Sequence, residues 1–88
     1  MTTTYFITHY FDEIAGDTND YKTLEEALKA LPTKQMLIDE MTTENNTANN
    51  RMKKGTTWSY VLWKMEYDEE DNPIDESIED IKEISYTW

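Results

Sequence analysis

The chain has 88 residues, no cysteine and a formal charge of −11. A chain of this length is expected to form one domain, 1–88, that buries only about 60–65% of its unfolded surface, and no disulfide adds to its stability. Aromatic residues make up 12% of the sequence, which excludes a disordered acidic tail, because such tails are poor in aromatic residues.

No apolar run approaches the roughly 20 residues that a membrane-crossing helix requires. The first ten residues also lack the basic and apolar regions of a secretory signal. We therefore expect a soluble, cytoplasmic protein with no membrane association.

The N-terminal part predicts a strand, a loop and a helix. Residues 4–11 are almost all strand formers, with aromatic side chains on both faces. Residues 12–22 are acidic and polar and contain Gly16, which indicates a loop. Thr23 is then expected to cap a helix that Pro32 ends.

The apolar positions of this helix follow helical spacing. Leu24, Ala27, Leu28 and Leu31 recur three to four residues apart. Because Leu28 lies in the middle of this stripe, it is expected to be a core residue whose replacement by Ala costs about 2–4 kcal/mol. A second short helix, capped by Thr33, is expected after Pro32.

The middle of the chain is polar. Residues 42–50 contain four Asn and three Thr and run into the basic cluster Arg51, Lys53 and Lys54, so a mobile loop is expected there. Residues 56–67 return to strand character, with Trp58, Tyr60 and Leu62 alternating against Val61, Trp63 and Met65.

The C-terminal segment has two interpretations. Residues 68–73 are rich in turn formers, and residues 84–88 favour a strand that pairs with 56–67 as a hairpin. Between them, Ile74, Ile78 and Ile81 fit a helix, whereas alternation fits a strand, and both remain open for 74–83. The predicted fold is α+β, a small twisted antiparallel sheet of three or so strands with one or two helices packed on it.

The charge is concentrated near the C-terminus. Between residues 66 and 83 there are ten acids and a single base, Lys82, a formal charge of −9, while the rest of the chain carries −2. Two carboxylates about 7 Å apart in water repel by roughly 0.6 kcal/mol. Either a partner reads these charges or they form an inert solubilising face. The candidate partner-binding residues are Glu66, Asp68, Glu69, Glu70, Asp71, Asp75, Glu76, Glu79, Asp80 and Glu83.

The same carboxylates are a poor match to a calcium loop. Counting from Asp68, residues Glu70, Asn72 and Glu79 fall on ligand positions, but Pro73 stands where the loop needs glycine. We therefore expect no metal or other cofactor.

Catalytic and nucleic-acid-binding roles have little support. His9 is the only histidine, it lies within a predicted strand, and neither glycine belongs to a phosphate-binding loop. The three basic residues at 51–54 would approach a polyanion against the field of the whole chain. We expect no enzyme and no direct nucleic-acid binding.

In type, the chain resembles the small acidic proteins that phages and other mobile elements use against host defences, including anti-CRISPR proteins and anti-restriction DNA mimics. The resemblance is carried by size, absence of cysteine, low Gly and Pro, Asn/Lys/Thr-rich usage and the run Glu66-Tyr-Asp-Glu-Glu-Asp. It implies a partner with a basic guide, target or PAM-reading channel. No functional residue is carried over by position.

Two hypotheses follow. The first is an acidic inhibitor that occupies the basic groove of a nucleic-acid-handling protein or ribonucleoprotein complex, with carboxylates in place of phosphates. The second is a non-enzymatic interaction or regulatory module that binds through aromatic side chains on an open sheet face, a homodimer included. The sequence leaves the oligomeric state open.

Overall fold

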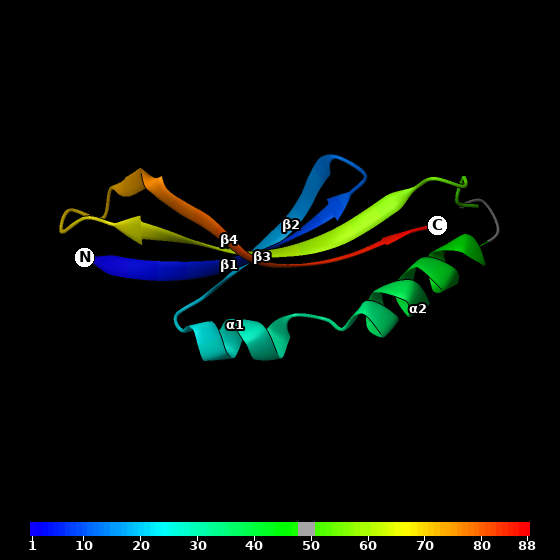
Figure 1. Ribbon diagram of the computed structural model, residues 1–88, viewed down its shortest axis with the longest axis horizontal. Coiled ribbons are helices and arrows are strands. Elements are labelled where there is room, and N and C mark those ends of the chain that lie inside the picture. Colours follow the sequence, from blue (N-terminus) through cyan, green and yellow to red (C-terminus); the bar gives the residue numbers. More distant parts are fainter. Residues whose placement is uncertain (48–50) are drawn as a thin grey trace.

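The architecture is a single antiparallel sheet with helices on one side. The computed structural model describes residues 1–47 and 51–88, and in these it contains four strands and two helices (Figure 1). They are β1 (Thr2–Phe11), β2 (Ile14–Tyr21), α1 (Leu24–Ala30), α2 (Lys34–Asn45), β3 (Thr57–Tyr67) and β4 (Pro73–Thr87). The sheet order is β2-β1-β3-β4. The predicted α+β class is therefore confirmed, with one strand more than expected.

The additional strand is β2, so the prediction of a loop over 12–22 is wrong. Its side chains are exposed except at Tyr21, and its residues are poor strand formers. Backbone pairing with β1 and a 2.9 Å hydrogen bond between the Thr8 and Thr18 hydroxyls hold it in place. Glycine suits position 16 because a Cβ there would lie 2.5 Å from the Phe11 ring and 3.0 Å from the His9 carbonyl oxygen, and one of these groups would have to move.

Both helices begin at the predicted caps. The Thr23 hydroxyl accepts the Glu26 N–H, and the Thr33 hydroxyl accepts the Met36 N–H. The predicted apolar stripe of α1 is only partly confirmed, because Ala27 is fully buried whereas Leu28 is 44% exposed. The prediction that Leu28 is a core residue is therefore wrong.

Helix α2 extends into the segment predicted to be a mobile loop. That prediction is wrong for residues 42–45, and residues 48–50 lie outside the described part of the chain. Thr42 and Thr43 are compatible with the helix because their hydroxyls donate to the carbonyls of Ile38 and Asp39, four residues earlier. Burial of Leu37 and Met41, one turn apart, fixes the helix on the sheet.

The core is small and central. Ile7 and Leu62 lie opposite each other on β1 and β3, and Ala27 of α1 packs on them. The molecule measures 49 × 22 × 18 Å, with a radius of gyration of 15.1 Å, against about 12 Å for a compact domain of this length. The end of the sheet that holds the β3–β4 turn therefore extends past the helices, while α2 lies along the other end, and one face of the sheet carries no helix (Figure 1).

The small core generates a prediction about two leucines. Leu37→Ala should lower the free energy of unfolding by about 2–4 kcal/mol, because Leu37 is fully buried. Leu28→Ala on the neighbouring helix is the matched control and should cost less than about 1 kcal/mol. Urea unfolding measures both, and equal losses would contradict the packing described above.

Candidate partner-binding site on the acidic hairpin

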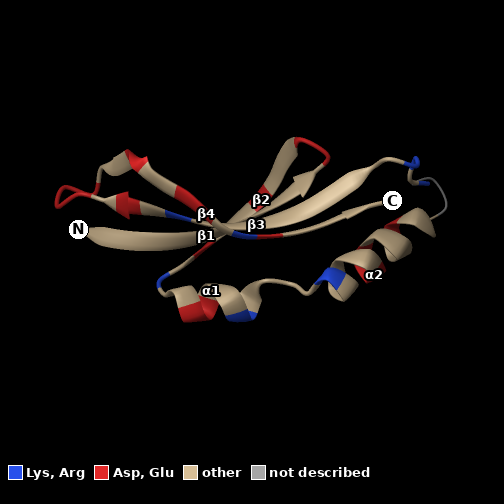
Figure 2. Ribbon diagram, in the orientation of Figure 1, with Lys and Arg blue, Asp and Glu red and all other residues tan. Residues whose placement is uncertain are grey.

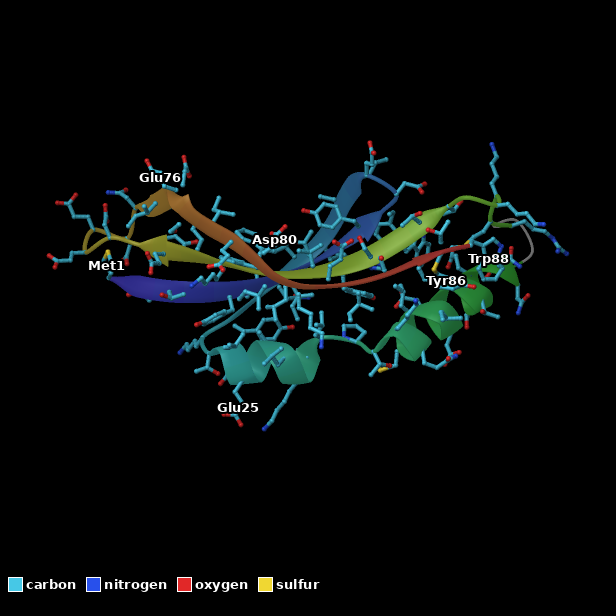
Figure 3. The ribbon with its side chains drawn as sticks, viewed as in Figure 1. Met1, Glu25, Glu76, Asp80, Tyr86 and Trp88 are labelled. Atoms are coloured by element: carbon cyan, nitrogen blue, oxygen red, sulfur yellow. The ribbon has the colours of Figure 1, made fainter. Side chains whose placement is uncertain are left out.

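The acidic segment forms the far end of the β3–β4 hairpin, and 74–83 is strand throughout. Thr2 pairs with Tyr67, so β1 supports β3 up to the turn at 68–72. Beyond that support lies only the turn itself. The turn and the adjoining part of β4 therefore present carboxylates at one end of the long axis, and the acidic positions of β4 continue from there to Asp80 near the middle of the molecule (Figures 2 and 3).

The turn is built by Asp68. One oxygen of its carboxylate accepts the N–H groups of Glu70 and Asn72, each at 2.9 Å. These hydrogen bonds, first that from Asn72, hold the pKa of Asp68 below its ordinary value. Asp71 adopts a left-handed backbone conformation with φ of 62°, which Asp tolerates better than most residues. Asp68 therefore shapes the turn, while the carboxylates of Glu69, Glu70 and Asp71 make no hydrogen bond within the described residues.

An irregularity in β4 places further carboxylates outside the ladder. Between the pairs Lys64–Glu79 and Glu66–Ile74, one residue of β3 faces four residues of β4. The Ser77 hydroxyl closes this bulge, accepting the Glu66 N–H at 2.7 Å and donating to the Ile74 carbonyl at 2.6 Å. The exposed residues at 75 and 76 lie in the bulge.

The ten acidic residues surround the hairpin and do not share one face. Glu66 and Glu79 lie on the helix side and Asp80 and Glu83 on the open side, while the others occupy the turn and the bulge. Figure 3 shows Glu76 and Asp80 projecting away from the helices. In the described residues the one ion pair of this segment is Lys64–Glu79, at 3.4 Å. The sequence identified these residues as a group but could not show their arrangement.

The hairpin carries about half the linear charge density of duplex DNA. From the Val61–Glu83 pair to the tip, eight residues of strand span about 26 Å. Its ten carboxylates and the two bases Lys64 and Lys82 leave a net charge of −8, about one charge per 3.3 Å, against one per roughly 1.7 Å of duplex axis. The hairpin is therefore a narrow polyanion of fixed shape.

Aromatic side chains divide between the two faces of the sheet. On the open face Phe6 and Trp63 stack with ring centroids 4.3 Å apart, and the Trp63 indole N–H donates to the Thr8 hydroxyl at 3.0 Å. Tyr67 lies on the same face, because it follows Trp63 by four residues along β3. Trp58 and Tyr60 lie on the helix side instead. The aromatic side chains of β3 are therefore shared between the helix side and the open face of the sheet.

The basic cluster lies at the other end of the molecule. Arg51, Lys53 and Lys54 are exposed and lie beside the C-terminus, remote from the acidic turn (Figure 2). The acidic turn and the basic cluster therefore lie at opposite ends of the molecule.

His9 connects the sheet to α2. Its ring stacks on Tyr60 at 4.1 Å, and the Tyr60 hydroxyl donates to the Glu40 carboxylate at 2.8 Å. Burial lowers the pKa of His9, and the negative charges of Glu40 and Asp17 partly oppose the shift. Burial and the bond to Glu40 raise the pKa of Tyr60. His9 Nε2 lies 3.4 Å from the Glu40 carboxylate and has no hydrogen-bond partner among the described residues. The contact of Glu40 with both His9 and Tyr60 joins α2 to the sheet.

The described residues contain no group of three or more His, Cys, Asp or Glu side chains placed to hold a metal ion. Asp68 and Glu79, two residues of the calcium-loop pattern, are engaged with the turn and with Lys64 respectively. A surface depression lies at the β1–β2 turn, lined by Asp12, Glu13, Ile14, Gly55 and Thr57. There the Asp12 carboxylate already accepts the Thr57 N–H.

Comparisons with protein-family models, with curated proteins and with solved structures find no match for this chain. Across the described residues, neither helix has the length and apolar character needed to cross a membrane.

The partly buried histidine His9 predicts a pH dependence. Since the folded state lowers the pKa of His9 below 6.5, the unfolded chain binds a proton more readily, and stability falls as pH drops below about 6.5. Protonation of carboxylates relieves their mutual repulsion as the pH falls and also changes stability. The effect of His9 is therefore measured as the difference in stability between the wild-type protein and a variant without the histidine. The wild-type protein should lose stability relative to His9→Gln between about pH 8 and pH 5. A constant difference in urea unfolding would show that His9 titrates normally.

Proposed function

We propose that this protein is a small acidic inhibitor that binds the basic, nucleic-acid-binding groove of a host nuclease or CRISPR effector complex by charge mimicry. The observation that carries the proposal is the protruding hairpin, in which ten acidic residues surround a rigid support and one of them has an ion-pair partner in the described residues. Charges kept unpaired at this density repel one another and are best explained by a cationic partner. Such a target places the inhibitor in the host cytoplasm.

The arrangement of the carboxylates around the hairpin favours a partner with a concave groove rather than one with a flat binding surface. Carboxylates point to the helix side, to the open side and outward from the tip. A concave basic channel that surrounds nucleic acid offers Arg and Lys from several directions. The carboxylates of the hairpin can pair with Arg and Lys side chains on all sides of such a channel.

A second candidate function is supported by a separate observation. The stacked pair Phe6 and Trp63 lies half-buried on the face that carries no helix. Aromatic side chains of this kind are typical anchors of protein interfaces. An interaction module that binds through this face would be insensitive to salt.

Charge reversal at the hairpin tests the first function. The variant combines four exposed acids that the turn does not need, Glu69→Lys, Glu70→Lys, Asp75→Lys and Glu76→Lys. It should keep the fold, because none of these side chains makes a hydrogen bond in the described residues, and it should lose at least about tenfold in affinity for the partner. Asp68 is left intact because its carboxylate builds the turn.

The control reverses the same number of exposed acids elsewhere, namely Glu13, Asp17, Glu25 and Asp39. Circular dichroism checks that both variants fold, and titration against the partner recovered from a bacterial lysate gives the affinities. Equal loss in both variants would indicate net charge alone, and full binding by the hairpin variant would reject mimicry.

Salt and nucleic acid should both weaken binding. Raising the salt from about 0.1 M to about 1 M shortens the Debye length from about 10 Å to about 3 Å, so the complex should dissociate. Labelled duplex or guide RNA should be displaced from the partner by this protein at low salt, because carboxylates and phosphates require the same side chains. Simultaneous binding with unchanged affinities would favour the aromatic-face module.

A further inference from the structure

A small recess lies on the open face beside the acidic turn. It has a volume of about 230 Å³ and is lined by Thr2, Thr4, Tyr67 and Asp71. Pockets for small molecules are typically about 300–1,000 Å³. This recess is therefore suited to a single side chain.

The lining groups have a common chemical preference. Tyr67 supplies an aromatic ring, the two threonines supply hydroxyl groups, and Asp71 supplies a carboxylate that makes no hydrogen bond within the described residues. Asp68, in contrast, is occupied by the backbone of the turn. A ring, acceptor oxygens and a free carboxylate together match a guanidinium, which stacks on aromatic faces and pairs with carboxylates through two parallel hydrogen bonds.

We propose that this recess takes an arginine side chain of the basic partner, an inference that rests on the proposed function and specifies it. The other carboxylates of the hairpin attract positive charge of any kind. The recess adds selectivity for arginine, because a planar guanidinium can stack on the ring and pair with the carboxylate together. A lysine ammonium is a strongly hydrated point charge that cannot make both contacts in this way. The protein therefore prefers grooves in which arginine, rather than lysine, contacts the nucleic acid.

The chain's own arginine does not fill the recess. Arg51 is the one arginine in the sequence and lies at the opposite end of a molecule 49 Å long (Figure 2). A second copy could bring its Arg51 to the recess, but two chains of charge −11 repel each other. Charge complementarity favours a basic partner.

The test uses two labelled peptides of equal charge, hexa-arginine and hexa-lysine, in fluorescence anisotropy at one salt concentration. The wild-type protein should bind hexa-arginine about threefold to tenfold more tightly. Asp71→Asn should remove this preference, and Asn tolerates the left-handed backbone at that position. Glu69→Gln removes the same charge from the same turn outside the recess and should keep the preference.

A second pair of variants separates the ring from its hydroxyl. Tyr67→Leu should remove the preference for arginine, and Tyr67→Phe should keep it, because the aromatic face is retained. Circular dichroism of each variant establishes that it folds.

The outcomes distinguish the recess from the proposed function. Equal, salt-sensitive binding of both peptides would overturn the proposal that the recess binds arginine, and it would leave the acidic hairpin as a general cation-binding surface. A preference for arginine that survives Asp71→Asn would place guanidinium recognition elsewhere and also overturn it. If neither peptide binds, both proposals fail. Concentration-dependent dimerisation that Arg51→Lys abolishes would make a second copy the occupant and overturn the basic partner.

Discussion

The packing of Ala27 on Ile7 and Leu62 is the contact on which the rest of the structure depends. It joins α1 to the central strands β1 and β3, and no larger side chain is buried in α1. In the described residues just two further apolar side chains, Leu37 and Met41, are fully buried beneath α2. A core of this size covers the centre of the sheet and the end beneath α2, and it leaves the end with the β3–β4 turn to be held by backbone pairing.

This constraint explains why the acidic hairpin can exist as it does. The distal part of β3 and β4 has no hydrophobic layer, so carboxylates there remain hydrated and incur no burial cost. An isolated two-stranded hairpin would be only marginally stable in water. Here β1 pairs with β3 as far as Tyr67, and Asp68 and Ser77 fix the turn and the bulge. The result is a polyanion whose shape is set by the fold, and under the proposed function this preorganisation would reduce the entropy lost on association.

The sequence predicted the elements with strong local signals. Helix caps at Thr23 and Thr33 and the alternation of β3 are local features, and each was found where expected. Strand β2 was missed because its pairing with β1, not its own residues, makes it a strand. Helix α2 was cut short because threonine and asparagine normally indicate loops, whereas here threonine hydroxyls bond to carbonyls one turn earlier.

The candidate site was predictable in composition and not in shape. The acidic run can be read directly from the sequence, but its division between two faces depends on the bulge closed by Ser77, a contact with no sequence signature. The stripe of α1 failed at Leu28 for a related reason. Periodicity identifies the buried side of a helix, but it does not show that the sheet approaches so closely that only Ala27 fits.

The central claim is that the acidic hairpin occupies a site where the partner holds nucleic acid. The most direct measurement is a structure of the complex by electron cryomicroscopy, compared with the same partner bound to nucleic acid. The account predicts carboxylates of 66–83 within about 4 Å of the Arg and Lys side chains that contact phosphates in the nucleic-acid complex. A complex in which the helices or the Phe6–Trp63 face contact the partner, with the hairpin in solvent, would contradict it.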